Sequence, residues 1–275
     1  MKDGTYFRKG DSRIIQRFRC RHCGKRFSKA TNSLLFRQRK RRVHTPLKRL
    51  LASGNSMRRS AKLLGIDKKT VARKLVLLAK LARLSQANFL KKLQSNPVIF
   101  LQVDDLITFE HTKLKPLTVS LAVDKKTRAI LGAEVGQIPA FGHLAELSRQ
   151  KYGKRKSLHR QTFTRLCSLI QDSIGKFAVI ESDEHPLYPD ILKSFFPEAT
   201  HIRYKGGRGC IVGQGELKKK RWDPLFGINH SCAMIRENIN RLIRRTWSTT
   251  KDPQMLKLHL DIFIDYYNRE HLALG

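Results

Sequence analysis

The sequence predicts a multidomain α/β protein: a zinc-ribbon remnant and a helix-turn-helix, followed by a mixed-sheet domain with helices on both faces. Three observations support this prediction. Two largely apolar runs, at 98–105 and 177–183, end in carboxylates, as buried strands that open onto a site do. Most of the positive charge lies in the first third of the chain. After Pro97 the composition changes, and strand and helix patterns alternate.

The distribution of charge separates the first third from the rest. The chain holds 56 Lys+Arg against 22 Asp+Glu, a net charge of +34. Residues 1–95 contain 28 of these basic residues and 3 of the acidic ones, which is +25. This predicts a polyanion-binding region, with nucleic acid as the polyanion. The longest apolar stretches have the length of strands, so no membrane partner is expected.

Residues 1–44 are expected to form short strands around a turn at 9–11, a zinc knuckle and a basic linker. Cys20 and Cys23, followed by Gly24, supply half of the four ligands that structural zinc requires. The pair therefore resembles the second half of a zinc ribbon whose first half would precede Met1. The scattered cysteines are expected to be buried as small apolar residues; they are Cys167, Cys210 and Cys232.

Residues 45–96 have the pattern of a helix-turn-helix that binds duplex DNA. Thr45 and Pro46 begin the first helix, Ser56 caps the second, and Asp67 caps the third after a turn at Gly65. An ordinary helical hairpin is the alternative. The residues that the third helix is expected to expose to the major groove are Lys68, Lys69, Thr70, Arg73 and Lys74.

Residues 97–275 show the element order of a ribonuclease-H-like domain. The first strand is followed by strands at 115–123 and 128–136, with a hairpin turn between them. A helix at 162–174, a strand at 177–181, a helix at 189–196 and a strand at 200–204 come next. After a long polar segment, helices are expected at 229–245 and 254–269.

Asp104 and Asp183 end the two apolar runs. If these strands are neighbours in one sheet, the two carboxylates converge and form a site for Mg²⁺ or Mn²⁺, which take oxygen ligands. Asp105 points to the opposite face, because successive residues of a strand alternate. It is expected behind the site or at the surface.

Three segments carry a family resemblance: QVDD at 102–105, SDEHPLY at 182–188, and NHSCAMIRENINRLIRRTWSTTK at 229–251. Together with the knuckle and the helix-turn-helix, they resemble the transposases of the first-described bacterial insertion-sequence family. The resemblance implies an Asp-Asp-Glu nuclease that binds element terminal repeats and target DNA as a homo-oligomer. It also implies a cytoplasmic, nucleoid-associated protein.

The family's third acid, a Glu, falls at Asn229, so activity is in question. Asn229 and Glu237 are the main candidates for the third position, with Glu216 and Asp223 as further alternatives. The basic residues expected to contact DNA phosphates, unless they lie on a solvated face, are Arg236, Arg241, Arg244 and Arg245. Two functions stay open: a transposase that cuts and joins DNA, and a transposase-derived DNA-binding protein without catalysis.

Overall fold

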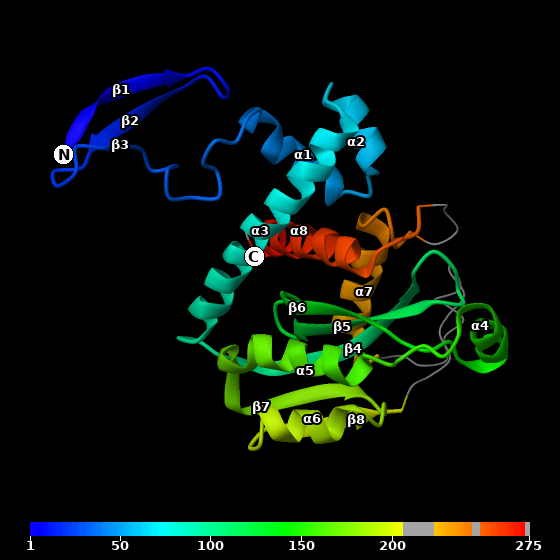
Figure 1. Cartoon of the computed structure of the whole chain (residues 1–275). Coiled ribbons are helices and arrows are strands. Elements are labelled where there is room, and N and C mark those ends of the chain that lie inside the picture. The colour runs from blue at the N-terminus through cyan, green and yellow to red at the C-terminus, as the bar shows by residue number, and fades with distance from the viewer. Residues whose placement is uncertain (206–222, 244–247, 273–275) are drawn as a thin grey trace.

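The computed structural model describes residues 1–205, 223–243 and 248–272. Along the chain, a small N-terminal sheet is followed by a helical unit and then by a larger α/β unit (Figure 1). The candidates Glu216, Arg244 and Arg245, with Cys210 and most of the predicted polar segment, lie outside the described residues.

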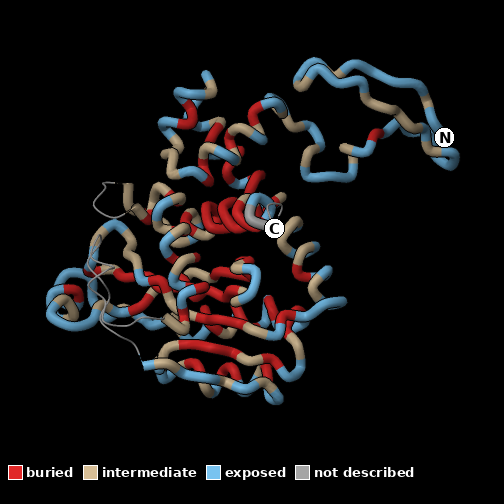
Figure 2. Tube along the Cα trace, turned by 180° about the vertical axis from the view of Figure 1, so that it is seen from behind, coloured by how far each residue is buried: buried red, intermediate tan, exposed pale blue. Residues whose placement is uncertain are grey.

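The N-terminal sheet is antiparallel and consists of β1 (Lys2–Arg8), β2 (Arg13–Arg19) and β3 (Arg26–Phe27). The predicted strands and the turn between them are confirmed, and a bidentate Arg8–Asp11 pair closes this turn. Figure 2 shows that almost all of this sheet is exposed or half-buried, in contrast to the rest of the chain.

The helical unit contains α1 (His44–Leu51), α2 (Met57–Leu63) and α3 (Lys68–Leu93). The predicted caps of α2 and α3 are confirmed, since Ser56 accepts from the N–H of Arg59 and Asp67 from that of Lys69. The predicted start of the first helix at Thr45 and Pro46 is wrong by one to two residues, because α1 already begins at His44 and has no side-chain cap. Helix α3 continues through the predicted connecting segment as one helix of 26 residues. It continues because buried apolar side chains recur on one face as far as Leu90 and no proline interrupts them.

The larger unit is built on a five-stranded mixed sheet of order β6-β5-β4-β7-β8. Strand β4 (Val98–Phe109) pairs antiparallel with β5 (Pro116–Asp124) and parallel with β7 (Ile174–Asp183). The edges are β6 (Ile130–Gln137) and β8 (Thr200–Tyr204). This order is compatible with a ribonuclease-H-like core. All of β5 from Pro116 to Val123 is buried, as expected for an inner strand covered on both faces.

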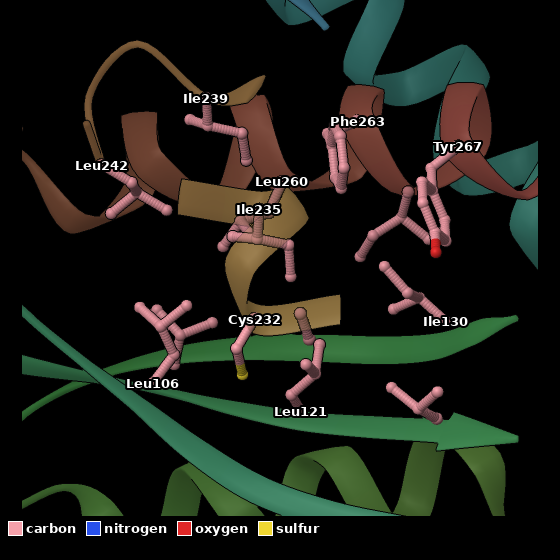
Figure 3. Packing of buried hydrophobic residues seen from close by; sticks show 14 of the residues in the cluster. Leu106, Leu121, Ile130, Cys232, Ile235, Ile239, Leu242, Leu260, Phe263 and Tyr267 are labelled. Carbon is pink, nitrogen blue, oxygen red and sulfur yellow. The ribbon is translucent and has the colours of Figure 1, made fainter. Parts of the chain in front are cut away.

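Helices cover both faces of this sheet, as predicted. One face packs against α5 (His159–Ile170) and α6 (Tyr188–Phe195). The other packs against α7 (Phe226–Asn238) and α8 (Pro253–Leu272), and Figure 3 shows this layer around Ile235 and Phe263. A short helix that the sequence did not predict, α4 (Ala145–Tyr152), follows β6. Helix α7 ends well before the predicted residue 245, because the backbone is extended at Ile239.

Helix α8 belongs to two cores at once. Leu258 and Ile262 pack with the helical unit, whereas Leu260 and Phe263 pack on the sheet. Ion pairs extend this contact: Asp265 binds Lys48 of α1, and Asp261 binds Arg83 of α3. The helical unit and the α/β unit are therefore joined by a shared apolar layer. None of the helices in the described ranges is long and apolar enough to cross a membrane.

Candidate functional site

Asp104 and Asp183 lie on neighbouring parallel strands, as the sequence predicted. Gln102 pairs with Glu181 in the register of β4 and β7, across a sequence separation of 79 residues. Asp104 and Asp183 have the same separation and follow this pair by two residues. They therefore lie on the same face of the sheet as Gln102 and Glu181. Neighbouring strands in a sheet are about 4.8 Å apart, so the two aspartates are close together.

The environment of Asp104 disfavours its negative charge. Burial raises the pKa of Asp104 to about 7, and the charges of Asp183 and Asp105 act in the same direction. The backbone N–H of Asp105, which donates to Asp104 Oδ1 at 2.7 Å, and the charge of Arg236 oppose this effect. A second positive charge beside this carboxylate would relieve the cost of its ionisation.

Asp105 faces the opposite side of the sheet, as predicted, but it is not a surface group. Its Oδ1 accepts from Thr118 and Ser120 at 2.7 and 2.6 Å. Its Oδ2 accepts from the Tyr188 hydroxyl at 2.6 Å and lies 2.6 Å from His159 Nε2. These contacts lower the pKa of Asp105 although burial, the largest effect, opposes them. The carboxylate ties β5, α5 and α6 to the strand that carries Asp104.

The segment between Asp183 and Tyr188 folds tightly around the end of β7. The N–H of His185 donates to Asp183 Oδ1 at 3.0 Å, and the N–H of Leu187 donates to His185 Nδ1 at 3.2 Å. The His185 ring packs edge-on against His159 at 4.8 Å. Tyr188, fully buried, then reaches Asp105. The segment thus connects Asp183 to the residue next to Asp104.

The start of α7 is held over the same sheet face as the two aspartates. The buried Gln102 side chain accepts from the N–H of Ile228 at 2.9 Å and donates to Pro224 O and Glu181, both at 2.8 Å. At Gly227 an added Cβ would lie 2.7 Å from Gln102 Oε1, so a side chain there would push the helix away. The contacts of Gln102 therefore fix the distance between the start of α7 and β4.

Gln102 and Glu181 are site-supporting residues that the sequence analysis missed. Glu181 is buried and accepts from Lys125 Nζ at 2.6 Å as well as from Gln102. A signal was present, because each strand carries a polar residue two positions before its aspartate, on the same face. The role of His159 had no such signal, since only the tertiary fold brings α5 to Asp105.

Neither of the two main candidates for the third position supplies a carboxylate beside Asp104. Asn229 is exposed, and its Nδ2 donates to Asp223 Oδ2 at 2.9 Å. Asp223 also accepts from the N–H of Leu225, so it is engaged at the start of α7. Glu237 is exposed near the other end of that helix. Among the described residues, no three His, Cys, Asp or Glu side chains form a group that could hold a metal ion.

The α7 side chains that interact with Asp104 are Cys232 and Arg236, one turn apart. Burial raises the pKa of the Cys232 thiol to about 12, and the charge of Asp104 adds to this. Arg236 lowers the pKa of Asp104. The positive charge of Arg236 thus acts on Asp104 from the helix that also carries Asn229.

Two carboxylates on one sheet face are suitable ligands for a single divalent cation such as Mg²⁺ or Mn²⁺. The raised pKa of Asp104 supports this fit, because a bound cation supplies the positive charge that the buried carboxylate needs. A second ion would need further oxygen ligands from the substrate.

Four of the five α3 residues that were predicted to be exposed are at least partly exposed. Lys68, Lys69 and Arg73 are exposed near the start of the helix, and Thr70 is half-buried. The prediction of an exposed Lys74 is wrong. Its side chain is buried, its pKa is lowered mainly by that burial, and Nζ donates to Arg39 O at 2.7 Å and Gln38 Oε1 at 3.1 Å. Lys74 anchors the basic linker to α3.

We expect Lys69→Ala and Arg73→Ala to weaken binding to a preferred duplex by about 1–3 kcal/mol while leaving scrambled duplex less affected. Arg39→Ala and Lys40→Ala should weaken both duplexes alike, because these residues lie on the linker. Fluorescence anisotropy on matched duplexes measures the difference. Equal losses on both duplexes for the α3 variants would contradict a reading role.

Arg241 has a packed rather than a free position. Burial lowers its pKa, and its guanidinium contacts Met57 Sδ of α2 at 3.7 Å. Close by, Gly54 donates its N–H to Asn238 O at 2.8 Å and accepts from Asn240. The segment after α7 thus binds the turn between α1 and α2.

The cysteines divide into a knuckle pair and a buried set. Cys23 is exposed and Cys20 half-buried, and backbone N–H groups of Cys23 and His22 lower the pKa of the Cys20 thiol. This favours the thiolate that zinc binds. Among the described residues, no third ligand joins this pair. Cys167 and Cys232 are buried, as predicted.

With two thiol ligands, we expect zinc to bind at less than one ion per chain or to be shared between chains. A chelator should leave the melting of the α/β unit nearly unchanged, because the knuckle lies outside that core. Atomic absorption and thermal melting measure the two effects. One tightly held zinc in each monomeric chain would overturn this expectation.

Comparison with known proteins adds no family to this description. No protein-family model matches the sequence, and a search of curated proteins finds no match.

Proposed function

We propose that the chain is a DNA transposase that binds duplex terminal repeats and carries out metal-dependent cleavage and joining of phosphodiester bonds. The observation that carries this proposal is the placement of Asp104 and Asp183 on the same face of the neighbouring strands β4 and β7, two residues beyond the pair Gln102–Glu181. The exposed basic start of α3 supports DNA as the substrate. The five-stranded mixed sheet supports a ribonuclease-H-like catalytic domain.

In this mechanism the protein contributes mainly placement and charge. Asp104 and Asp183 would hold a divalent cation, which supplies Lewis-acid stabilisation of the phosphoryl oxygens. Arg236 lies on α7, where it can neutralise a phosphate next to the aspartate pair. Asp105, Tyr188 and Gln102 keep the strand, α6 and α7 in place around the pair.

A second function is favoured by the surroundings of Asn229. Its side chain is exposed and bonded to Asp223, and Arg236 is the charged α7 group that interacts with Asp104. Since no third carboxylate joins the pair within the part of the chain that the structure describes, we expect the free protein to hold metal weakly. A DNA-binding protein of transposase origin without catalysis is therefore the alternative.

The two functions are distinguished by cleavage of duplex DNA that carries the terminal repeats of the element encoding the chain. For a transposase we expect slow nicking or joining, better with Mn²⁺ than with Mg²⁺. Asp183→Ala should reduce it about 100-fold or more, because it removes a ligand and not merely a supporting group. DNA affinity of this variant should be unchanged.

Asn229→Glu tests the third position. If residue 229 is the third position, the substitution should raise activity and tighten metal binding, since it would add a carboxylate to Asp104 and Asp183. If Asn229→Glu has no effect while Glu237→Ala removes activity, Glu237 is the third ligand. If the unmodified chain binds the repeats but no metal supports cleavage, the binding function holds and the transposase function fails.

A further inference from the structure

A hollow lined by arginines and aromatic rings lies between the N-terminal sheet and the linker that follows it. Its volume is about 420 Å³. Strands β1 to β3 form one wall, and the segment at 28–41 forms the other. We call it the arginine hollow after the five arginines that line it, which are Arg8, Arg17, Arg26, Arg37 and Arg41.

The guanidinium groups of this hollow are held in place and outnumber the carboxylates beside them. Asp3 binds Arg26 at 2.7 Å and Arg17 at 3.3 Å. Arg8 forms its bidentate pair with Asp11 at the β1–β2 turn. Since two carboxylates face five guanidiniums, an excess of positive charge remains for an anionic ligand. Fixed guanidinium groups are the side chains best suited to phosphate.

Three aromatic residues, Tyr6, Phe27 and Phe36, line the same hollow and remain partly exposed. The Phe27 ring already stacks on Phe18, with the ring centres 5.6 Å apart, which leaves Tyr6 and Phe36 as the faces for a ligand. Tyr6 is 38% exposed and Phe36 is 46% exposed. The guanidinium of Arg37 lies 5.2 Å from the centre of the Phe36 ring. Exposed rings between fixed cations are the arrangement that binds a base by stacking and its phosphate by charge.

The segment at 28–41, which forms the second wall, has a left-handed backbone conformation at two residues that are not glycine. Arg37 and Lys40 both have positive φ angles, of 54° and 49°, which L-residues disfavour. Arg41 donates to the carbonyls of Leu35 and Gln38, and Lys74 donates to Arg39 O. These bonds from two basic side chains hold the wall in this conformation. Such conformations gather at binding sites.

We propose that the arginine hollow binds an unpaired nucleotide of a DNA strand, with the base on Tyr6 or Phe36 and the phosphate on the arginines. This inference rests on the proposed DNA-binding function. Paired bases inside a duplex present their faces to one another, so the rings can stack only on a base at a strand end, in a single-stranded tail or flipped out. The hollow thus distinguishes DNA ends from continuous duplex.

The test compares the full chain on a blunt duplex and on the same duplex with a tail of about six thymidines, at one salt concentration. We expect the tail to tighten binding about tenfold or more. Phe36→Leu and Tyr6→Leu should each remove most of that gain and leave blunt-duplex affinity unchanged. Arg37→Ala should reduce the gain as well.

Matched controls lie close to each variant. Phe7 follows Tyr6 in β1 but faces the other side of the sheet and is 59% exposed, so Phe7→Leu should keep the full gain. Arg39 is exposed two residues after Arg37 but does not line the hollow, so Arg39→Ala should weaken tailed and blunt DNA alike. The melting temperature of each variant should be measured to check that it is folded.

Equal wild-type affinity for tailed and blunt duplex would overturn this inference, as would an equal loss of the gain in Phe7→Leu and Phe36→Leu. Neither result affects the helix-turn-helix, which is tested by the blunt duplex itself. Failure to bind any blunt duplex would instead refute the proposed DNA-binding function.

Discussion

Asp104→Asn is expected to raise the melting temperature of the metal-free protein at pH 8 and, at the same time, to abolish metal-dependent cleavage. Burial raises the pKa of Asp104 to about 7, so at pH 8 the folded chain holds a carboxylate that its surroundings disfavour. Asparagine removes the charge and can still accept the bond from the Asp105 N–H. The gain in unfolding free energy should be on the order of 2–4 kcal/mol.

The pH dependence of this gain follows from the raised pKa. The folded state binds the proton more tightly than the unfolded chain, whose Asp pKa is about 3.9, so wild-type stability falls as pH rises between these values. The advantage of Asp104→Asn should be complete above pH 7, shrink as pH falls and disappear near pH 4. Urea unfolding at several pH values measures it.

A suitable control is Asp190→Asn, since the Asp190 side chain is 79% exposed on α6. It should change stability little at any pH. Adding Mn²⁺ should stabilise the wild type but not Asp104→Asn. If Asp104→Asn were less stable than the wild type at pH 8 without metal, the assigned environment of Asp104 would be wrong.

The same substitution one residue later is expected to have the opposite effect on stability. Asp105→Asn places an amide group against donors from Thr118, Ser120 and Tyr188, so at least one buried polar group loses its partner. We expect a loss on the order of 2–4 kcal/mol at pH 7. Urea denaturation gives this value directly.

The lowered pKa of Asp105 sets the pH window for its contribution. The stabilisation is present above the unfolded pKa of about 3.9 and is lost as pH falls through the lower folded value. Tyr188→Phe removes only one of the four contacts, so its effect should be smaller. An Asp105→Asn variant no less stable than Asp190→Asn would show that the four contacts do not stabilise the fold.

The strands and the aspartate pair could be predicted from the sequence because they depend on local pattern. Apolar runs of strand length end in Asp104 and Asp183, and a parallel pairing brings such ends together. Alternation along a strand placed Asp105 on the other face, and the caps Ser56 and Asp67 located the starts of α2 and α3. These features depend only on neighbours in the chain.

The rest of the site depends on contacts between distant segments. Lys74 has the helical spacing of an exposed residue, yet the linker folds back over it and buries it. The position of Asn229 depends on how Gln102 holds α7, and the cover over Asp105 depends on α5 reaching it. Periodicity within one element does not report such docking, which explains why the third acid could not be assigned from sequence.

The continuity of α3 fixes the spacing between the exposed basic start of that helix and the strand that carries Asp104. The helix has 26 residues, about 39 Å at ~1.5 Å per residue, and only residues 94–97 separate its end from β4, which carries Asp104. Helix α8 packs against both α3 and the sheet, so this connection is stiff. If the chain cuts DNA, the cleaved bond should lie a constant number of base pairs from the bound sequence. We can test this by inserting about five base pairs, half a helical turn, between the bound sequence and the bond that is normally cut. The distance from the bound sequence to the new cut should stay the same, so the cut should no longer fall at the original bond.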